Sequence, residues 1–228
     1  MSIKVLQGPM NKLNQSDVNV VIDVIRAFTV AHYAFIKGAK DIILVKTVKE
    51  ALNLKWENKK FLLAGEVNGL AIEGFDIDNS PCSLEQLKLT GKTLVQKTTN
   101  GVTAALNALD AKSIYVTGYS NAKTTANYIK KIYSRNFIAH IIASHPTGDD
   151  DLACAEYMRG IIEDTGLLTP SETEERIKAS SIAEKFYKEE MSEFNIKDLE
   201  YCVKEVDERF VMEVKIINGL PTIVRVNI

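Results

Sequence analysis

The chain has 228 residues, of which 46% are hydrophobic and 25% are charged, and its formal net charge at pH 7 is -2. A chain of this length and composition can bury a sizeable core, which excludes collagen-like, disordered and low-complexity proteins. Because there is no excess of basic residues, the composition does not indicate a protein that binds nucleic acid or an anionic membrane.

Three further features favour a cytoplasmic protein. The N-terminal residues are not followed by a long apolar run, which argues against a secretory signal peptide. No apolar run approaches the ~20 residues that are needed to span a bilayer. The cysteines Cys82, Cys154 and Cys202 form no CxxC pattern, and we expect free thiols in a reducing compartment. We therefore expect no membrane and no nucleic-acid partner, and homo-oligomerisation stays open.

Short runs rich in β-branched residues alternate along the chain with segments of helical periodicity. The runs predicted as strands are 18–25, 42–45, 61–64, 93–97, 114–117 and 137–143. They are almost continuously apolar, as is typical of strands covered on both faces. Apolar residues spaced i, i+3, i+4, i+7 predict helices at 102–109, 154–161 and 179–186. The alternation predicts an α/β fold, layered α/β/α with a mixed, largely parallel sheet, in one compact domain over residues 1–228.

The last third of the chain has a different character. Residues 169–193 are charged and carry acidic side chains near Pro170, which predicts a helix that begins there. Two predicted strands, 210–216 and 222–226, flank Asn218-Gly219, a pattern typical of a C-terminal β-hairpin. The alternative to one unit is therefore a two-lobed chain with a helical and hairpin part at 169–228.

Polar residues crowd the ends of the predicted strands, where ligands bind in α/β sheets. Asp23 interrupts the first apolar strand, and a carboxylate buried there is costly unless a cation or a metal pairs with it. Arg26 follows at the strand exit and suits the binding of anions, although a structural Asp23–Arg26 pair is the alternative. A second aspartate is missing at Ile25, which argues against the haloacid-dehalogenase type of phosphatase.

Further carboxylates follow the later strands. Glu66 stands between glycines after the strand 61–64, and Asp76 lies in an acidic, turn-rich segment. Asp150 and Asp151 begin a predicted helix, where the helix dipole alone would favour them. Carboxylates at such junctions can hold a hard divalent cation, with solvated turns and helix caps as the alternative.

The segment Lys97-Thr98-Thr99-Asn100-Gly101 joins a strand to an amphipathic helix. Its hydroxyls, amide, flexible glycine and free helix N–H groups would form a cradle for an anion, although the Walker A motif is absent. Asn121 repeats this arrangement after the next strand, and His145 lies at a further strand exit. Asn79 and Ser80 are natural helix caps that could instead face the pocket.

Taken in order, these segments resemble the motifs of the 2-phosphosulfolactate phosphatase family. The blocks that carry the resemblance are Val21-Ile22-Asp23-Val24-Ile25-Arg26-Ala27, then Gly65-Glu66 with Ile72-Glu73-Gly74-Phe75-Asp76 and Asn79-Ser80-Pro81, then Thr98-Thr99-Asn100-Gly101, Asn121-Ala122, and Asp150-Asp151 before Leu152-Ala153-Cys154-Ala155. The family commonly carries basic residues where this chain has Val67 and Thr103. Lys97, Arg26 and His145 are then the candidates to bind the acidic groups of the substrate.

The resemblance implies a mixed, layered α/β fold and a Mg²⁺-dependent phosphatase that converts 2-phospho-3-sulfolactate into sulfolactate and phosphate. The alternatives are a phosphatase for another small phosphorylated organic acid and a non-catalytic anion-binding protein. We expect Asp23, Arg26 and Asn100 to be catalytic, and attack by water or, as an alternative, a covalent route through Asp23. The residues expected to bind substrate are Lys97, Thr99, Asn100, Gly101, Asn79, Ser80, Asn121 and His145. The expected Mg²⁺ ligands are Asp23, Glu66 and Asp151, with Asp76 or Asp150 as substitutes.

Overall fold

The computed structural model describes residues 1–8, 13–133, 136–188 and 193–228. The strands are β1 (Ser2–Gln7), β2 (Ser16–Ile22), β3 (Asp41–Leu44), β4 (Leu62–Val67), β5 (Leu70–Ala71), β6 (Thr93–Lys97), β7 (Ala111–Thr117), β8 (Ile138–Ala143), β9 (Phe210–Ile217) and β10 (Leu220–Asn227). The α-helices are α1 (Ala27–Ile36), α2 (Val48–Glu57), α3 (Gly101–Asn107), α4 (Ala122–Ile132), α5 (Asp149–Glu163), α6 (Pro170–Ala179) and α7 (Ile196–Cys202). Three short 3-10 helices are η1 (Cys82–Leu84), η2 (Tyr119–Asn121) and η3 (Glu184–Tyr187).

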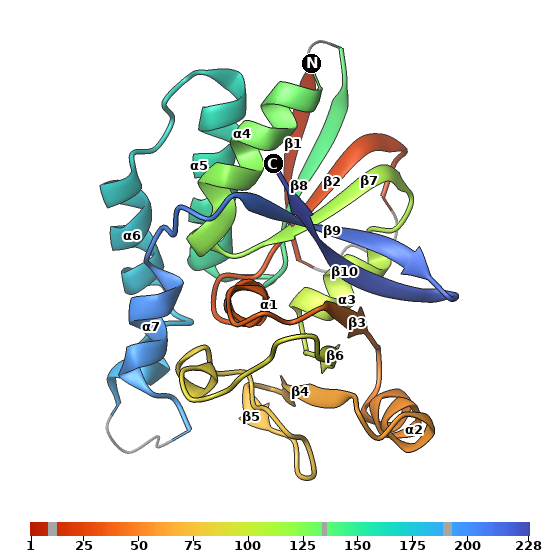
Figure 1. The fold of residues 1–228 in the computed structure, drawn as a ribbon. Helices are drawn as coiled ribbons and strands as arrows, with labels where there is room; N and C mark the ends of the chain where they lie inside the picture. Colours follow the sequence, from red (N-terminus) through yellow and green to blue (C-terminus); the bar gives the residue numbers. More distant parts are fainter. Residues whose placement is uncertain (9–12, 134–135, 189–192) are drawn as a thin grey trace.

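The strands of the described residues form a mixed sheet with the order β1-β8-β2-β7-β9-β10-β3-β6-β4-β5 (Figure 1). One half, β1-β8-β2-β7, is parallel, and so is the other half, β3-β6-β4. The hairpin β9–β10 pairs antiparallel with both halves and joins them. Asn218 and Gly219 at its turn have φ of 52° and 80°, as a tight hairpin turn requires. The predicted hairpin is therefore confirmed, but it lies in the middle of the sheet.

The twist of the sheet decides where the strand ends point. Since β9 is antiparallel to β7 and β10 is antiparallel to β3, the two parallel halves run in opposite directions. Neighbouring strands differ by about 20–25°, so the six steps from β2 to β4 add up to about 120–150°. This accumulated twist turns the carboxyl ends of β4 and β6 toward the same side as those of β2 and β8.

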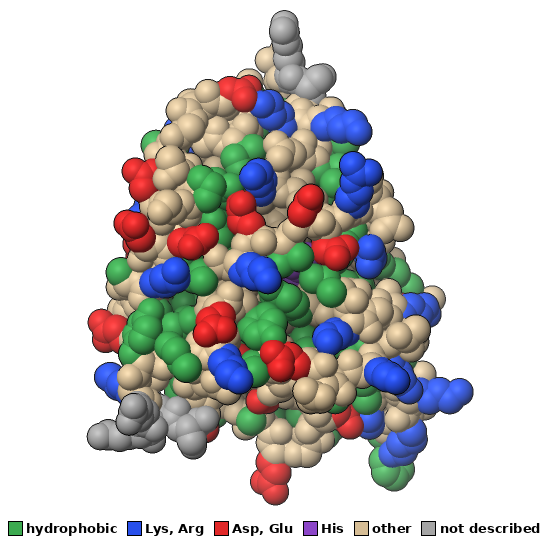
Figure 2. Space-filling model, turned by 60° about the vertical axis from the view of Figure 1, so that its left-hand side comes forward, with side chains coloured by type: hydrophobic (Ala, Val, Ile, Leu, Met, Phe, Trp, Pro, Cys, Tyr) green, Lys and Arg blue, Asp and Glu red, His purple; other side chains and the backbone are tan. Residues whose placement is uncertain are grey.

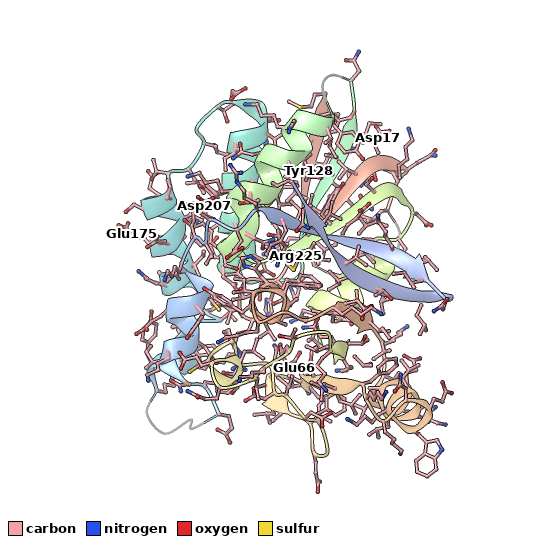
Figure 3. The ribbon with its side chains drawn as sticks, viewed as in Figure 1. Asp17, Glu66, Tyr128, Glu175, Asp207 and Arg225 are labelled. Carbon is pink, nitrogen blue, oxygen red and sulfur yellow. The ribbon has the colours of Figure 1, made fainter. Side chains whose placement is uncertain are left out.

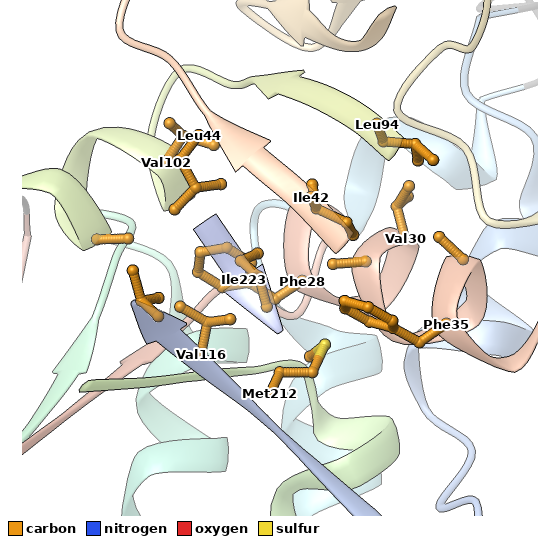
Figure 4. Packing of buried hydrophobic residues seen from close by; sticks show 14 of the residues in the cluster. Phe28, Val30, Phe35, Ile42, Leu44, Leu94, Val102, Val116, Met212 and Ile223 are labelled. Atoms are coloured by element: carbon orange, nitrogen blue, oxygen red, sulfur yellow. The ribbon is translucent and has the colours of Figure 1, made fainter. Parts of the chain in front are cut away.

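Helix α1 lies inside the curved sheet and fixes the loop that precedes it. Eight of its ten residues are buried, as is typical of a helix that is apolar all round and enclosed by the protein. Figure 4 shows Phe28 and Phe35 of this helix among Ile42 of β3, Leu94 of β6 and Met212 of β9. Each fully buried side chain of this kind contributes about 1.5–3 kcal/mol. The loop between β2 and α1 is therefore held from both halves of the sheet.

Helices also cover the outer faces of the sheet. Side chains of α4 and α5 pack on the first parallel half, and those of α2 pack on the second (Figure 1). The predicted layered α/β/α fold with a mixed, largely parallel sheet is confirmed. Its three cysteines are free thiols, as predicted. The part of the chain that the structure describes contains no helix both long and apolar enough to cross a bilayer.

The structure differs from the sequence prediction at several elements. Helices α2, α4 and α7 were not predicted, and the predicted strand 18–25 ends at Ile22, so Asp23 follows it. Strand β1 was not predicted, because its residues are exposed or half-buried and form no continuous apolar run. Helix α6 begins at Pro170, as predicted, behind a capping box at Thr169, but its regular part ends at Ala179. The extended backbone of Ser180 and the bond from the Ala183 N–H to Ser180 Oγ end the helix, so the predicted helix 179–186 is wrong. Residues 189–192 of the predicted segment 169–193 lie outside the described residues.

Candidate active site

A cleft of about 310 Å³ lies where the loops after β2, β4, β6 and β8 meet the segment around η3. Seven of the residues predicted for the site line it: Asp23, Arg26, Glu66, Asn79, Thr99, Asn100 and His145. The cleft is also lined by Ile25, Asn68, Gly69, Pro146, Ile182 and Lys185. Loops far apart in the sequence therefore meet at one place because the twisted sheet turns their strand ends together.

Asp23 follows β2 directly, and the backbone around it holds its carboxylate. The Ala27 N–H donates to Asp23 Oδ1 at 2.8 Å. The Ser144 hydroxyl lies 3.4 Å from Asp23 Oδ2. A Cβ added at Gly101 would lie 2.4 Å from Asp23 Oδ2, so a glycine is needed for α3 to approach the carboxylate this closely. Asp23 is thus fixed by the starts of two helices.

Asp151, in the first turn of α5, reaches across to the same loop. Its Oδ1 accepts the Val24 N–H at 2.7 Å, and its Oδ2 accepts the Ser144 hydroxyl and the His145 N–H, each at 3.0 Å. Because a hydroxyl has one proton, Ser144 donates to Asp151 or to Asp23 but not to both. The neighbouring Asp150 is buried, and its Oδ1 has no hydrogen-bond partner among the described residues.

Asp23, Asp150 and Asp151 form a buried group that we call the acid cluster. Burial and the charge of Asp151 raise the pKa of Asp23 from 3.8 to about 8, and Glu66 adds to this effect. Burial and the charge of Asp150 raise the pKa of Asp151 to about 8, while burial and Asp23 raise the pKa of Asp150 to about 7. Each carboxylate makes it harder for the next to ionise, so the cluster favours a cation beside it.

Glu66 lies on β4 and turns its carboxylate into the cleft. It accepts hydrogen bonds from the N–H groups of Gly69 and Thr99, and from the Thr99 hydroxyl at 2.9 Å. Figure 3 labels Glu66 in the lower half of the view, among the strands β4 to β6. Gly65 before it brings the backbones of β4 and β6 together, since a Cβ there would lie 1.8 Å from the Lys97 carbonyl oxygen. Glu66 is therefore rigidly placed at 5% exposure.

Arg26, directly before α1, is 5% exposed and is held by an acid that the sequence analysis missed. Its NH1 donates to Oδ2 of Asp198 at 2.7 Å, and its NH2 donates to the Gly69 carbonyl at 3.2 Å. Asp198 is fully buried in the first turn of α7 and also accepts the Ser80 hydroxyl at 2.6 Å. Nothing in the local sequence distinguishes Asp198 from an ordinary acid at a helix start.

Lys185 is the other site residue that sequence reasoning missed. It lies in η3, within a charged segment that reads as a solvated helix face. Its ammonium group lies 4.5 Å from the centre of the Phe194 ring, and burial and the Arg26 charge lower its pKa. The position of Lys185 directly before the aromatic pair Phe186-Tyr187 is the one local sign of a site residue, and it is weak.

His145 lies between the acid cluster and Lys185. Burial and the Lys185 charge lower its pKa from 6.5, so the ring is neutral at pH 7. The Thr147 N–H donates to His145 Nδ1 at 3.2 Å, which assigns the ring proton of the neutral form to Nε2. His145 therefore offers one N–H donor beside the cleft.

The structure places the other predicted residues outside the lining of the cleft. Asp76 accepts a hydrogen bond from Lys55 at 3.0 Å and one from the Leu63 N–H at 2.8 Å. Its carboxylate therefore binds the backbone of β4 and does not face the cleft. Asn121 is buried, and its Oδ1 accepts the Thr117 hydroxyl at 2.8 Å. Lys97 donates to the Glu66 carbonyl at 3.1 Å.

The remaining predicted residues act one layer behind the cleft. Ser80 binds Asp198, Gly101 packs against Asp23, and Asp150 and Asp151 lie in the acid cluster. Neither position that carries a basic residue in the family lines the cleft. Val67 is 39% exposed on β4, and the Thr103 hydroxyl donates at 2.8 Å to the Thr99 carbonyl, just before its own helix α3.

The donor set of the cleft fits a hard cation. In the parts of the chain that are described, no three His, Cys, Asp or Glu side chains form a complete ligand cage. However, Mg²⁺ takes only one or two protein carboxylates and fills its other positions with water and phosphate oxygens. Two carboxylates, Asp23 and Glu66, line the cleft. Behind them, Asp150 Oδ1 has no hydrogen-bond partner among the described residues and the pKa values of the acid cluster are raised, so ionisation there is unfavourable until a cation is bound.

Comparisons with known proteins agree with these observations. The sequence model of the 2-phosphosulpholactate phosphatase family matches residues 6–216. A Bacillus subtilis protein named "Probable 2-phosphosulfolactate phosphatase" is 54% identical over 226 residues, which is 99% of each chain. A Clostridium acetobutylicum protein of the same name is 34% identical over 198 residues, covering 82% of this chain and 84% of that protein. One from Caldanaerobacter subterraneus is 33% identical over 204 residues, covering 87% and 83%.

Proposed function

The chain belongs to the 2-phosphosulpholactate phosphatase family and is a phosphoric monoester hydrolase, and we propose that it hydrolyses 2-phospho-3-sulfolactate in a Mg²⁺-dependent reaction. One observation supports the proposal most directly: carboxylates and cationic side chains line the same cleft. The substrate is a small polyanion, so it needs cationic partners. Its phosphate reacts readily only when its negative charge is neutralised. The carboxylates of the cleft can hold the cation that neutralises it.

The residues that would hold Mg²⁺ are Asp23 and Glu66, with Asp150 and Asp151 adding negative charge behind them. When bound, the ion supplies neutralisation of the phosphate charge and a lower pKa of water. Arg26 and Asn100 line the same cleft and donate to the phosphoryl oxygens, where charge increases in the transition state. The Asp198 and Gly69 contacts hold the guanidinium of Arg26 in one orientation, so these bonds need little reorganisation.

Hydrolysis breaks the ester P–O bond and forms a P–O bond to water, and one proton from that water ends on the sulfolactate oxygen. His145 Nε2–H is the hydrogen-bond donor that we assign to the leaving oxygen, because it is the N–H of the neutral ring beside the cleft. The ring keeps this proton, and the leaving oxygen takes its proton from the attacking water. We assign Asp23 to the cation rather than to nucleophilic attack, because the Ala27 N–H occupies its Oδ1 and leaves Oδ2 as the oxygen that can bind a cation. The contacts therefore favour direct attack by water over a covalent route through Asp23.

The test is the release of inorganic phosphate by the purified chain from a panel of small phosphate esters, with Mg²⁺ or with EDTA. The panel contains 2-phosphosulfolactate, 2-phospholactate, a phosphoglycerate and p-nitrophenyl phosphate. We expect 2-phosphosulfolactate to be hydrolysed with the highest kcat/KM, and EDTA to abolish phosphate release until Mg²⁺ is returned. Preferred turnover of another phosphorylated acid would contradict the proposed substrate. Full activity in EDTA would contradict the proposed Mg²⁺ dependence. Binding without turnover of any ester would contradict the assignment as a phosphatase.

A further inference from the structure

Two cationic side chains line the cleft among the described residues, and they share one aromatic surface. The guanidinium carbon of Arg26 lies 5.1 Å from the centre of the Phe186 ring and 5.4 Å from that of Phe194. The Lys185 ammonium lies 5.7 Å and 4.5 Å from the same two centres. Cation–π attraction thus holds two like charges beside each other, an arrangement that repulsion opposes until an anion lies between them.

The two cations differ in how far the protein compensates them. Arg26 has a buried counter-ion, since Asp198 accepts its NH1 at 2.7 Å. Lys185 forms no ion pair with any residue in the described ranges, whose salt bridges all involve other side chains. Its charge is therefore available to an anion in the cleft.

No carboxylate of the described residues pairs directly with Lys185, although the charges of Glu66, Asp150 and Asp23 raise its pKa against the larger lowering by burial and Arg26. A Cβ added at Gly69 would lie 3.3 Å from the Lys185 ammonium nitrogen, so this turn lies directly against it. The N–H of Gly69 donates to Glu66, and its carbonyl accepts from Arg26. The turn at Gly69 therefore contacts both side chains, and the Glu66 oxygens already accept bonds from Gly69 and Thr99 rather than from Lys185.

We propose that Lys185 binds the second acidic group of the substrate, the sulfonate, and thereby selects phosphate esters that carry it. This inference rests on the proposed function, because it assigns a place to a group that does not react. The sulfonate suits this position better than the carboxylate does. It is the more weakly hydrated anion, so it loses less on moving beside the rings of Phe186 and Phe194. Contacts to a remote, unreacting group act mainly on KM.

The experiment compares 2-phosphosulfolactate with 2-phospholactate, which lacks only the sulfonate. Lys185→Met keeps the apolar stem against Phe194 and removes the charge, and Lys185→Arg restores a cation. Lys188→Met is the matched control, because Lys188 is exposed and does not line the cleft. We expect Lys185→Met to lower the preference for the sulfonated substrate by about 10- to 100-fold, mainly through KM, as for one charge-assisted hydrogen bond. Lys185→Arg should recover much of that preference.

A binding measurement separates this inference from the proposed function. Calorimetric titration of the whole protein with sulfolactate and with lactate needs no turnover. If the wild type hydrolyses neither ester but binds sulfolactate through Lys185, the sulfonate site stands and the proposed function falls. If the esters are hydrolysed but Lys185→Met changes affinity or KM equally for ligands with and without the sulfonate, or leaves both unchanged, the inference is overturned.

Discussion

Asp198 and Asp23 are two buried carboxylates near the same cleft, and their surroundings are opposite. Asp198 is 0% exposed and is matched by the Arg26 guanidinium, the Ser80 hydroxyl and the Cys82 N–H. Asp23 is 7% exposed, yet the charges that act on it are those of Asp151 and Glu66, which both raise its pKa. The fold thus neutralises one charge from within and leaves the other to be neutralised by something that binds.

The difference between Asp198 and Asp23 indicates that one supports the stability of the fold and the other its activity. A buried charge with an internal partner stabilises the arrangement of the loops that bring it, here the loop before α1 and the first turn of α7. Clustered like charges weaken the fold, and sites of this kind are where proteins accept lower stability for activity. Substitutions in the two regions should therefore change different measured quantities.

The largest effect is expected for Asp198→Ala. It leaves Arg26 buried without its counter-ion, which costs about 3–5 kcal/mol in the free energy of unfolding. Urea denaturation measures the loss. Lys112→Ala is the control, since Lys112 is 74% exposed and an exposed ion pair such as that with Asp17 adds little to stability. Equal losses in the two variants would remove the contrast between a neutralised and an uncompensated buried acid.

Asp23→Asn should reduce activity strongly and stability little. The change is nearly isosteric and removes the charge that the proposed cation needs, so kcat should fall at least ~100-fold, or about 2.7 kcal/mol. Asp76→Asn is the matched control, because Asp76 binds Lys55 and the Leu63 N–H outside the cleft. We expect the Asp76 variant to keep kcat within a few-fold. If the two variants lose kcat equally, the acid cluster has no special part in the reaction.

The acid cluster should also make metal-free protein less stable as the pH rises. The pKa values of Asp23 and Asp151 are raised to about 8 and that of Asp150 to about 7, whereas the unfolded chain ionises near 3.8. The folded protein therefore holds more protons, and its stability falls from about pH 4 to about pH 8, by up to about 1.4 kcal/mol per pH unit for each carboxyl.

Thermal unfolding in EDTA between pH 5.5 and 8.5 measures this slope. Asp23→Asn should flatten it, because one of the three carboxyls no longer titrates. Mg²⁺ should raise Tm more at pH 8 than at pH 6, since the cation binds the ionised form. A Tm that rises with pH in EDTA, with the same slope in Asp23→Asn, would show that the cluster is compensated in another way.

Much of the fold follows from local patterns in the sequence. The run 93–97 was predicted with the bounds that β6 has, because a strand buried on both faces is apolar throughout. The hairpin turn at Asn218-Gly219 was predicted because few residue pairs adopt that turn. The place of the hairpin between β7 and β3 was not predicted, since it depends on pairing between residues distant in the sequence.

The site divides in the same way. Asp23 and Asn100 follow strands and Glu66 lies near the carboxyl end of β4, where the general rule for α/β sheets places ligand-binding residues, and all three line the cleft. Lys185 lies in η3 and Asp198 in α7, after α6, where no strand end marks them. A half-buried lysine and a buried acid in a charged stretch look the same in sequence as solvated ones. Their roles depend on the contacts of Phe194 and Arg26, which only the three-dimensional structure shows.

The smallest effect is expected at Thr99, whose hydroxyl connects the site to its support. It donates to Glu66 Oε2 at 2.9 Å and accepts the Asn68 N–H at 2.8 Å, so it orients the carboxylate without adding charge. Thr99→Val has the same shape and removes one of three donors to Glu66, for a loss of about 1.5 kcal/mol or roughly tenfold in kcat/KM. Thr99→Ser keeps the hydroxyl and should stay within a few-fold of the wild type. If both variants lost activity equally, the methyl group would matter rather than the hydrogen bond. If neither variant lost activity, the N–H groups of Gly69 and Thr99 would suffice to hold Glu66. The Thr99 hydroxyl would then not be needed to orient this carboxylate.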